Sequence, residues 1–321
     1  ISLYYYMKNN LSNIKKAIKY LNNSECIGIP TETVYGLAGN AYSNVATLKI
    51  FRLKKRPKKN PLIVHYSNLQ DLKKDCEIND LFLKLYKKYS PGPISFVLKL
   101  KKTSKISNNV TNGKKTLAVR FPKHQLTRYL LKKLNYPLAA PSANISKRIS
   151  PVCKDDVKDE FGKKLKYILD GGRSKIGLES TIINLVDKPE ILRLGGFDKK
   201  KIKKYIDKKY YKKIRKNKIL VPGQGKTHYS PGIPMRLNAI NIRKNEALLL
   251  IKKRKERNKN FFYLSKNKNV KEIAKNLYKT LRKVKKRGYK ILAIEKIPQK
   301  GIGETINDRL IRAAKKLWKK L

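Results

Sequence analysis

The sequence predicts a mixed α/β protein in which a second, smaller, doubly wound parallel α/β domain follows the first. Three observations support this prediction. Short apolar runs alternate with segments of helical periodicity, and 40% of the 321 residues are apolar, which is enough for a packed core. A stretch rich in Gly and Pro then separates two such regions. We therefore expect domains at residues 10–208 and 241–321, joined by a linker at 209–240.

The first region contains the elements of the larger domain. Apolar residues at helical spacing predict one helix around Ile78–Tyr89 and a second around Leu126–Leu134. Six short runs predict strands, at Cys26–Pro30, Leu62–Tyr66, Ile94–Leu100, Leu117–Phe121, Ser180–Val186 and Ile191–Leu194. This succession of strands and helices is typical of a mixed α/β fold.

The second region repeats a strand and helix alternation. Strands are predicted at Ala247–Ile251, Phe261–Leu264 and Ile291–Ile294. An apolar stripe from Val270 to Val284 predicts a long helix, and a further helix closes the chain. Such alternation is typical of a small parallel sheet.

The chain carries a formal charge of +57, from 79 Lys and Arg against 22 Asp and Glu. A field of this sign favours anionic partners such as nucleotides or RNA. Only 16 of the 79 cations are arginine, however, and the codon bias of an AT-rich genome also enriches lysine at surface positions that tolerate it. The total charge leaves both explanations open, so cations in an unusual local geometry are more informative.

The cysteines and histidines indicate the redox environment of the protein and whether it binds a metal ion. The cysteines Cys26, Cys76 and Cys153 form no CxxC pair, so they indicate neither a disulfide framework nor a zinc site. The three histidines share no metal-ligand spacing, and no protein-held metal is predicted. The N-terminal ISLYYYMKNN lacks the apolar core of a signal peptide, and no run is long enough to span a membrane. We expect a cytoplasmic protein without membrane contact.

One cationic segment, IFRLKKRPKKNPLIVHY (Ile50–Tyr66), has an unusual geometry. Proline disfavours helical geometry in the residue before it, so a helix should end near Arg56 with its cations beyond the helix end. Held between Pro57 and Pro61, these cations could bind a polyphosphate, and the arginine fork suits phosphate oxygens. A solvated basic loop is the alternative. At the end of the following strand, His65 is either an ordinary core histidine or a ligand-binding one.

Three polar turns adjoin predicted strands: PTETVYGLAGNA (Pro30–Ala41), AAPSANIS (Ala139–Ser146) and GLESTIINL (Gly177–Leu185). Small, hydroxylated and glycine residues suit turns against which a ligand packs closely. The same residue types also cap ordinary loops, so each turn alone is a weak signal.

Together these stretches resemble the YrdC-like threonylcarbamoyl-AMP synthases. The resemblance covers about residues 10–200, where seven motifs occur in the family's order: PTETVYGLAGNA, KKRPKKNPLIVH, SPGPISFVLK, LAVRFP, APSANIS, GLESTIINL and ILRLGG. It continues into THYSPG (Thr227–Gly232), similar to the HYAP segment of the long two-domain form, and into GIGETINDRLIRAA (Gly301–Ala314).

The resemblance implies an open, twisted mixed sheet around a cationic cavity and a nucleotidyltransferase reaction. Such enzymes convert L-threonine, bicarbonate and ATP, the last with Mg²⁺, to threonylcarbamoyl-AMP and pyrophosphate, and a threonylcarbamoyl transferase uses the product to modify tRNA beside the anticodon. The threonine-binding residues implied are Thr33, His65, Arg120, Ser142 and Ser180. The ATP-binding residues implied are Arg56, Asn60, Thr116, Asn144, Val152, Arg193 and Tyr229, with Lys54 and Arg56 acting catalytically at the phosphates.

The residue types suit that chemistry. Arg120, at a strand end, can bind an amino-acid carboxylate bidentately. A carbamate formed from threonine then attacks the α-phosphate, so no covalent enzyme intermediate is needed. Lys54, Arg56 and Arg193 would neutralise the developing phosphate charge together with Mg²⁺. His65 would position threonine rather than act as a base.

The linker is expected to act as a lid. Carbamates decompose in water, so a cover formed by VPGQGKTHYSPGIP (Val221–Pro234) would lay Tyr229 over the nucleotide. Alternatively, Tyr229 anchors the linker to a domain. The chain departs from the family at Val152, where a threonine is usual, so a hydroxyl contact to ATP is lost or made by the backbone.

Two other functions are weighed against this one. A non-catalytic RNA-binding protein of the same fold would use the positive charge on tRNA or double-stranded RNA, but it would not require Arg120 beside a cluster of hydroxyls. Carbamoyl transfer in hydrogenase maturation uses zinc-finger and acylphosphatase units, for which this chain has neither the cysteines nor the length.

Overall fold

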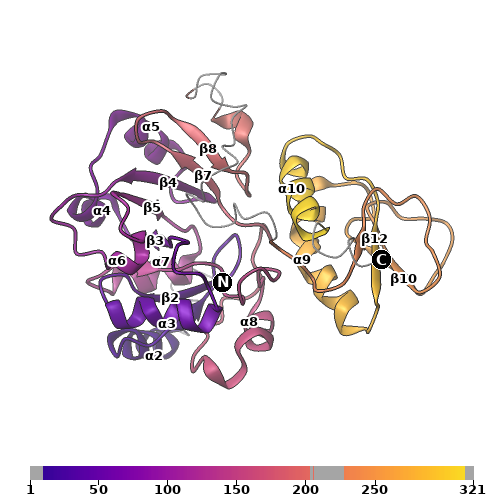
Figure 1. The fold of residues 1–321 in the computed structure, drawn as a ribbon, viewed down its shortest axis with the longest axis horizontal. Helices are drawn as coiled ribbons and strands as arrows, with labels where there is room; N and C mark the ends of the chain where they lie inside the picture. The colour runs from indigo at the N-terminus through magenta and orange to yellow at the C-terminus, as the bar shows by residue number, and fades with distance from the viewer. Residues whose placement is uncertain (1–9, 203–204, 206–227, 315–321) are drawn as a thin grey trace.

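The computed structural model describes residues 10–202, 205 and 228–314, which form two sheets with their helices (Figure 1). Most of the predicted linker, including 221–227 of the predicted lid, lies outside these residues, and the domain boundaries stay a prediction. Within the described part of the chain, the helices are too short or too polar to cross a membrane.

The larger unit is built on an eight-stranded mixed sheet in the order β1-β2-β6-β3-β5-β4-β7-β8. The pairs β3–β5 and β4–β7 are parallel, and the other neighbours are antiparallel. This confirms the predicted mixed α/β sheet. Its strands are β1 (Ile27–Ile29), β2 (Gly36–Asn40), β3 (Ile63–His65), β4 (Ile94–Lys99), β5 (Thr116–Arg120), β6 (Leu138–Ala139), β7 (Thr181–Asn184) and β8 (Glu190–Arg193).

The sequence patterns did not predict β2 and β6. The GLAGN run of β2 lacks the β-branched and aromatic residues that mark strands, and it reads as part of a turn. Its small residues allow a close approach of the helix α3 (Asn44–Lys54), because a Cβ at Gly39 would already lie 3.4 Å from the Cβ of Ala46. Packing therefore overrides strand propensity at this position.

Helix α3 ends as the prolines predict. It begins at the Ser43 cap, whose Oγ accepts a hydrogen bond from the Ala46 N–H at 3.1 Å. It ends at Lys54, and Lys55 takes a left-handed conformation with φ 47°. The other helices of this unit are α2 (Leu11–Asn22), α4 (Leu69–Asp75), α5 (Asp80–Tyr89), α6 (Asn108–Thr111), α7 (Gln125–Lys132) and α8 (Lys154–Phe161).

The smaller unit has four parallel strands in the order β11-β10-β12-β9, which confirms the predicted parallel domain. Its helices α9 and α10 lie between this sheet and the larger unit (Figure 1). The elements are β9 (Met235–Arg236), which the sequence patterns did not predict, β10 (Glu246–Leu250), β11 (Phe261–Tyr263), α9 (Val270–Lys286), β12 (Ile291–Ile294) and α10 (Ile302–Ala314).

One hydrophobic cluster joins the two units. Val34, Ile149 and Leu178 of the larger unit pack with apolar residues of α9 and α10. Polar contacts add to it: the Arg173 guanidinium donates to the Lys275 carbonyl at 2.7 Å. Val34 and Leu178 belong to two of the polar turns described above, so the smaller unit packs directly behind those turns.

Candidate active site

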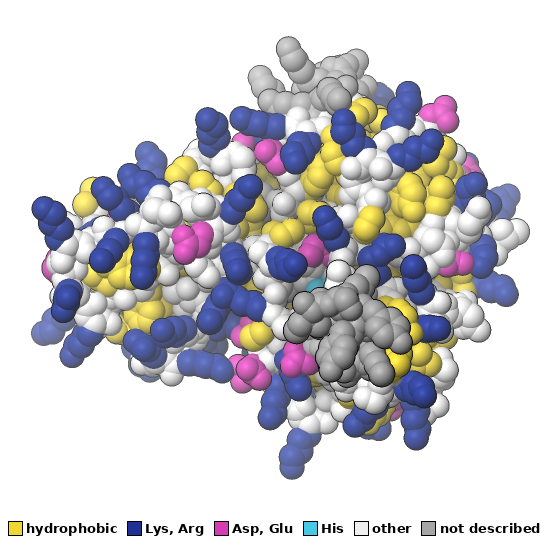
Figure 2. All heavy atoms as spheres, turned by 180° about the vertical axis from the view of Figure 1, so that it is seen from behind, with side chains coloured by type: hydrophobic (Ala, Val, Ile, Leu, Met, Phe, Trp, Pro, Cys, Tyr) yellow, Lys and Arg dark blue, Asp and Glu magenta, His cyan; other side chains and the backbone are white. Residues whose placement is uncertain are grey.

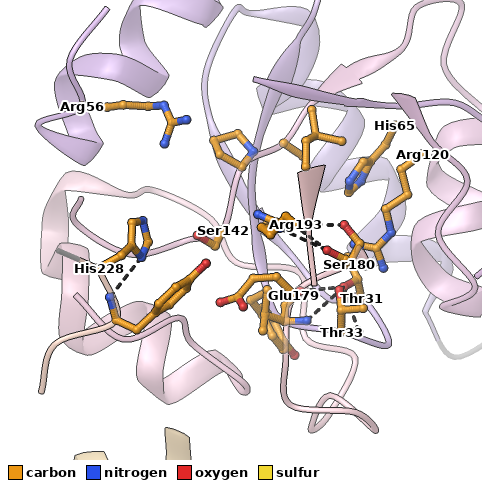
Figure 3. A pocket seen from close by; sticks show the side chains of 17 residues that line it. Thr31, Thr33, Arg56, His65, Arg120, Ser142, Glu179, Ser180, Arg193 and His228 are labelled. Carbon is orange, nitrogen blue, oxygen red and sulfur yellow. Dashed lines mark hydrogen bonds between the residues drawn. The ribbon is translucent and has the colours of Figure 1, made fainter. Parts of the chain in front are cut away.

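One cavity gathers most of the predicted site residues. It encloses about 530 Å³ of empty space, part of it open to solvent. Arg56 and His228 lie at one end and His65 and Arg120 at the other (Figure 3). The predicted residues that line it are Thr33, Arg56, His65, Arg120, Ser142, Ser180, Arg193 and Tyr229.

Arg56 shows what the proline-bracketed bend does. Its Nε donates to the Asn60 carbonyl at 3.1 Å and its Nη2 to the Pro61 carbonyl at 2.9 Å. The bend therefore holds the guanidinium at the cavity wall before any ligand arrives. Burial, and then the charge of Arg193, lowers the pKa of Arg56 to about 10, so the group stays cationic at neutral pH.

Lys54 lies behind the wall rather than in it. The side chain is 1% exposed, and its Nζ donates to the backbone carbonyls of Ser142 and Asn144. Burial, followed by the charge of Arg56, lowers the pKa of Lys54 well below its usual value. In this arrangement Lys54 fixes the loop that presents Ser142, and its contact with phosphates stays a prediction.

His65 and Arg120 lie side by side at the ends of parallel strands β3 and β5, where the register pairs them directly. The Arg120 Nη2 donates to Glu32 Oε1 at 2.7 Å in a buried ion pair, and its Nε donates to the Gly92 carbonyl at 3.4 Å. These contacts orient the fork, and among the described residues none accepts from its Nη1, which leaves that edge for a ligand. Burial, and then Arg120, lowers the pKa of His65 well below its usual value, so the imidazole is neutral at neutral pH.

Two hydroxyl groups of the cavity are held by neighbouring hydroxyl groups. Thr33 Oγ1 lies 2.7 Å from Thr31 Oγ1, and Ser180 Oγ lies 2.8 Å from Ser95 Oγ. A wall of this kind offers donors and acceptors without adding charge. It suits the neutral parts of an amino-acid substrate.

His228 and Tyr229 line the cavity from the end of the linker. Tyr229 is 1% exposed and has a left-handed backbone with φ 65°, which is uncommon for a bulky residue. The His228 N–H donates to the Arg312 carbonyl at 3.4 Å, and the Ser230 N–H donates to the Lys147 carbonyl at 3.0 Å. Both units therefore hold this segment in place.

The protonation state of His228 follows from the same contacts. Burial lowers the pKa of His228 to about 3. Its Nδ1 accepts the Tyr229 N–H at 3.0 Å, so the neutral ring carries its proton on Nε2. The cavity thus receives a neutral donor at this end.

Five predicted residues do not line the cavity: Lys54, Asn60, Thr116, Asn144 and Val152. The Asn144 amide donates to the carbonyls of Ile145 and Arg148 at 2.8 and 3.0 Å. The Val152 N–H donates to Asp156 Oδ2 at 2.8 Å, so this backbone group is already engaged. The ATP contacts assigned to these five residues stay predictions.

Nine residues that line the cavity are missing from the predicted set, among them Thr31, Glu179 and His228. Each of these three lies beside a predicted residue in a motif, so adjacency was the available signal. Glu179 is buried and accepts hydrogen bonds from Ser150 and Tyr278. Burial alone would raise its pKa, but the charges of Arg309 and Arg193 hold the pKa of Glu179 below its usual value, so it is ionised.

Two buried polar atoms in this cavity indicate a ligand. Across the described residues, His65 Nδ1 and the Tyr229 hydroxyl have no hydrogen-bond partner. An unsatisfied buried polar atom costs about 1–3 kcal/mol. A substrate that reaches both ends of the cavity would supply the two partners.

The fold and the cavity define a class of protein: a mixed α/β protein whose cationic, hydroxyl-lined cavity is backed by a second domain. The family model Sua5_yciO_yrdC, described as telomere recombination, matches residues 19–195. A second, Sua5_C, described as the C-terminal domain of threonylcarbamoyl-AMP synthase, matches residues 197–315. The chain belongs to the Sua5/YciO/YrdC family, in its two-domain form, which confirms the predicted resemblance.

Relatives match the chain over nearly its whole length. It is 34% identical to threonylcarbamoyl-AMP synthase of Pyrococcus abyssi over 94% of both chains. It is 32% identical to threonylcarbamoyl-AMP synthase of Bacillus subtilis, covering 96% of this chain and 94% of that one. The crystal structure of P. abyssi Sua5 complexed with L-threonine matches with a TM-score of 0.84 at 32% identity, again over 94% of both chains.

Proposed function

We propose that this chain is an L-threonylcarbamoyladenylate synthase, a nucleotidyltransferase that makes threonylcarbamoyl-AMP and pyrophosphate from L-threonine, bicarbonate and ATP. The observation that carries the proposal is the division of a single cavity. Arg120 and neutral hydroxyls form one end, and Arg56 forms the other with His228 (Figure 3). Full-length similarity to proteins named threonylcarbamoyl-AMP synthase supports it.

The Arg120 end suits L-threonine. The free edge of the Arg120 fork takes the carboxylate, and the hydroxyls of Thr33 and Ser180 orient the rest. Neutral His65 offers its unsatisfied Nδ1 for a hydrogen bond, for example with the substrate hydroxyl or amine. His65 therefore acts as a positioning group.

The Arg56 end suits the triphosphate. The threonine amine first adds to carbon dioxide derived from bicarbonate and loses a proton, which gives a carbamate. A carbamate oxygen then bonds to the α-phosphorus while the bond from that phosphorus to the bridging oxygen breaks, and pyrophosphate leaves. Arg56 and Arg193 would stabilise the negative charge that grows on the phosphate oxygens. The residues bind and orient, and no bond to the protein forms.

We propose that Mg²⁺ arrives with ATP and is not held by the chain. In the described residues no group of three His, Cys, Asp or Glu could hold a metal ion. Glu179, an acidic residue of the cavity wall, already accepts hydrogen bonds from Ser150, Tyr278 and Arg309. The phosphates themselves are then the ligands of the ion.

We further propose that the labile product passes to a tRNA-modifying threonylcarbamoyl transferase in the cytoplasm. The three cysteines are unpaired, which fits a reducing compartment. RNA binding alone is less well supported. Lysine and arginine side chains are scattered over the visible face and do not gather into one patch (Figure 2).

Pyrophosphate release tests the proposal. Purified protein with ATP and Mg²⁺ should release pyrophosphate only when both L-threonine and bicarbonate are present. Omitting either should abolish the signal, and L-serine serves as a matched substrate control. Release that continues without threonine, or no release with all substrates present, would contradict the assignment.

A further inference from the structure

The smaller unit reaches the cavity wall through one buried arginine. Arg309 of α10 is 1% exposed, and its Nε donates to Glu179 Oε2 at 3.0 Å. Its Nη2 donates to the Leu194 carbonyl at 2.6 Å, next to Arg193. The guanidinium also lies 4.5 Å from the centroid of the Tyr229 ring. One side chain therefore touches two residues of the wall, Glu179 and Tyr229, and the backbone next to a third, Arg193.

The helix α9 contributes a second contact to the same carboxylate. The Tyr278 hydroxyl lies 3.1 Å from Glu179 Oε1 and 3.2 Å from Oε2, and its ring stacks on Tyr229 with centroids 6.3 Å apart. Ser150 Oγ of the larger unit donates to Oε1 at 2.6 Å. Among the described residues, two of the three side chains that donate to Glu179 thus come from the smaller unit.

Glu179 needs this neutralisation because of where it lies. A buried carboxylate at the wall would repel a triphosphate, and Arg193 is a second cation whose charge acts on it. Arg193 donates through Nε and Nη2 to the Ser180 carbonyl at 3.2 and 2.8 Å. Without Arg309, the carboxylate would compete with Ser180 for Arg193.

We propose that the smaller domain serves the reaction through Arg309, a positioning residue that neutralises Glu179 and fixes Arg193 and Tyr229 at the ATP end of the cavity. The proposal rests on the synthase function argued above and assigns the second domain a part in building the nucleotide site. Arg309 itself touches no substrate.

The test compares Arg309→Gln with Arg173→Gln in the full chain. Arg173 also bridges the two units, through Lys275 and Asn276, but it does not line the cavity or touch Glu179. Arg309→Gln should raise the ATP KM at least about thirtyfold, because the buried Glu179 carboxylate loses its ion-pair partner, and should change the threonine KM less than about threefold. Arg173→Gln should keep both KM values near those of the parent.

A double variant distinguishes neutralisation of the Glu179 charge by Arg309 from a purely structural role of this side chain. Adding Glu179→Gln to Arg309→Gln removes the unpaired charge and should lower the ATP KM again by about tenfold. Tyr278→Phe keeps the ring against Tyr229 and loses only the hydroxyl, so it should raise the ATP KM at least about tenfold, the worth of one hydrogen bond to a charged group. Because this change is small, it tests the proposal even if Arg309→Gln fails to fold.

An unchanged ATP KM in Arg309→Gln, an equal rise in Arg173→Gln, or no recovery in the double variant would overturn the proposal. If Arg309→Gln does not fold, an unchanged ATP KM in Tyr278→Phe overturns it. Failure of the synthase function is distinct from these outcomes. It would appear as a parent protein without threonine-dependent pyrophosphate release.

Discussion

Replacing Arg120 with lysine tests the threonine end of the cavity. Arg120 is 4% exposed and already gives Nη2 to Glu32 at 2.7 Å. Lysine keeps the charge that Glu32 needs, but its single nitrogen cannot also present a fork to a carboxylate. Losing one hydrogen bond to a charged group costs about 1.5–3 kcal/mol, so the threonine KM should rise about tenfold to 150-fold.

The assay is pyrophosphate release at varied threonine and saturating ATP. The ATP KM should change less than about threefold, because Arg120 lies at the far end of the cavity from Arg56 (Figure 3). Arg128→Lys on α7, whose side chain is not part of the cavity, is the matched control. A parental threonine KM in Arg120→Lys would refute the reasoning, and so would an equal rise in the ATP KM.

Two other predictions concern the ATP end. Arg56→Ala should lower kcat/KM for ATP about a hundredfold, because a preoriented donor to the developing phosphate charge is lost; initial rates at varied ATP measure this, and a parental value would mean that the triphosphate binds elsewhere. The folded-state pKa of His228 is about 3 against an ordinary 6.5, so below pH 6.5 the unfolded chain takes up a proton that the folded chain does not, and stability falls as the pH drops towards 3. His228→Asn should therefore lessen the loss of stability by about 1.4 kcal/mol per pH unit in that window. Urea unfolding at pH 6.5 and pH 5 measures how steeply the free energy of unfolding changes with pH. A change equal to the parent's would show that His228 is not buried in its neutral form.

The sequence predicted the elements whose composition matches their environment. The apolar runs of β3, β4, β5 and β10 are β-branched or aliphatic, and the structure forms strands there. The strand β2 was not predicted, because its small residues have low strand propensity and suit the close packing of α3 instead. Strand propensity depends on the local sequence alone, whereas this strand depends on a helix that packs on it.

The candidate site shows a similar division. Motif spacing brought Arg56, His65 and Arg120 to one cavity. Motif spacing did not predict the direction of the side chains. The Lys54 Nζ donates to a carbonyl in the loop after β6, and the Val152 N–H donates to Asp156. Spacing along the chain fixes which strand end a residue occupies, but packing decides whether its side chain reaches the cavity.

The second domain's contribution was also hidden from the sequence. Arg309 lies in the motif GIGETINDRLIRAA, which indicated a closing helix and the two-domain form of the family but no role for this side chain. Its role depends on Glu179, which is 130 positions away, and on the docking of two domains. No local pattern encodes a contact of that separation.

The most direct test of the account is a crystal structure with L-threonine and a non-hydrolysable ATP analogue bound together. The account predicts the threonine carboxylate on the Nη1 edge of Arg120 and the triphosphate between Arg56 and Arg193, with the Tyr229 hydroxyl bonded to a ligand. Density for either molecule outside this cavity, with Arg56 or Arg120 unbound, would contradict it.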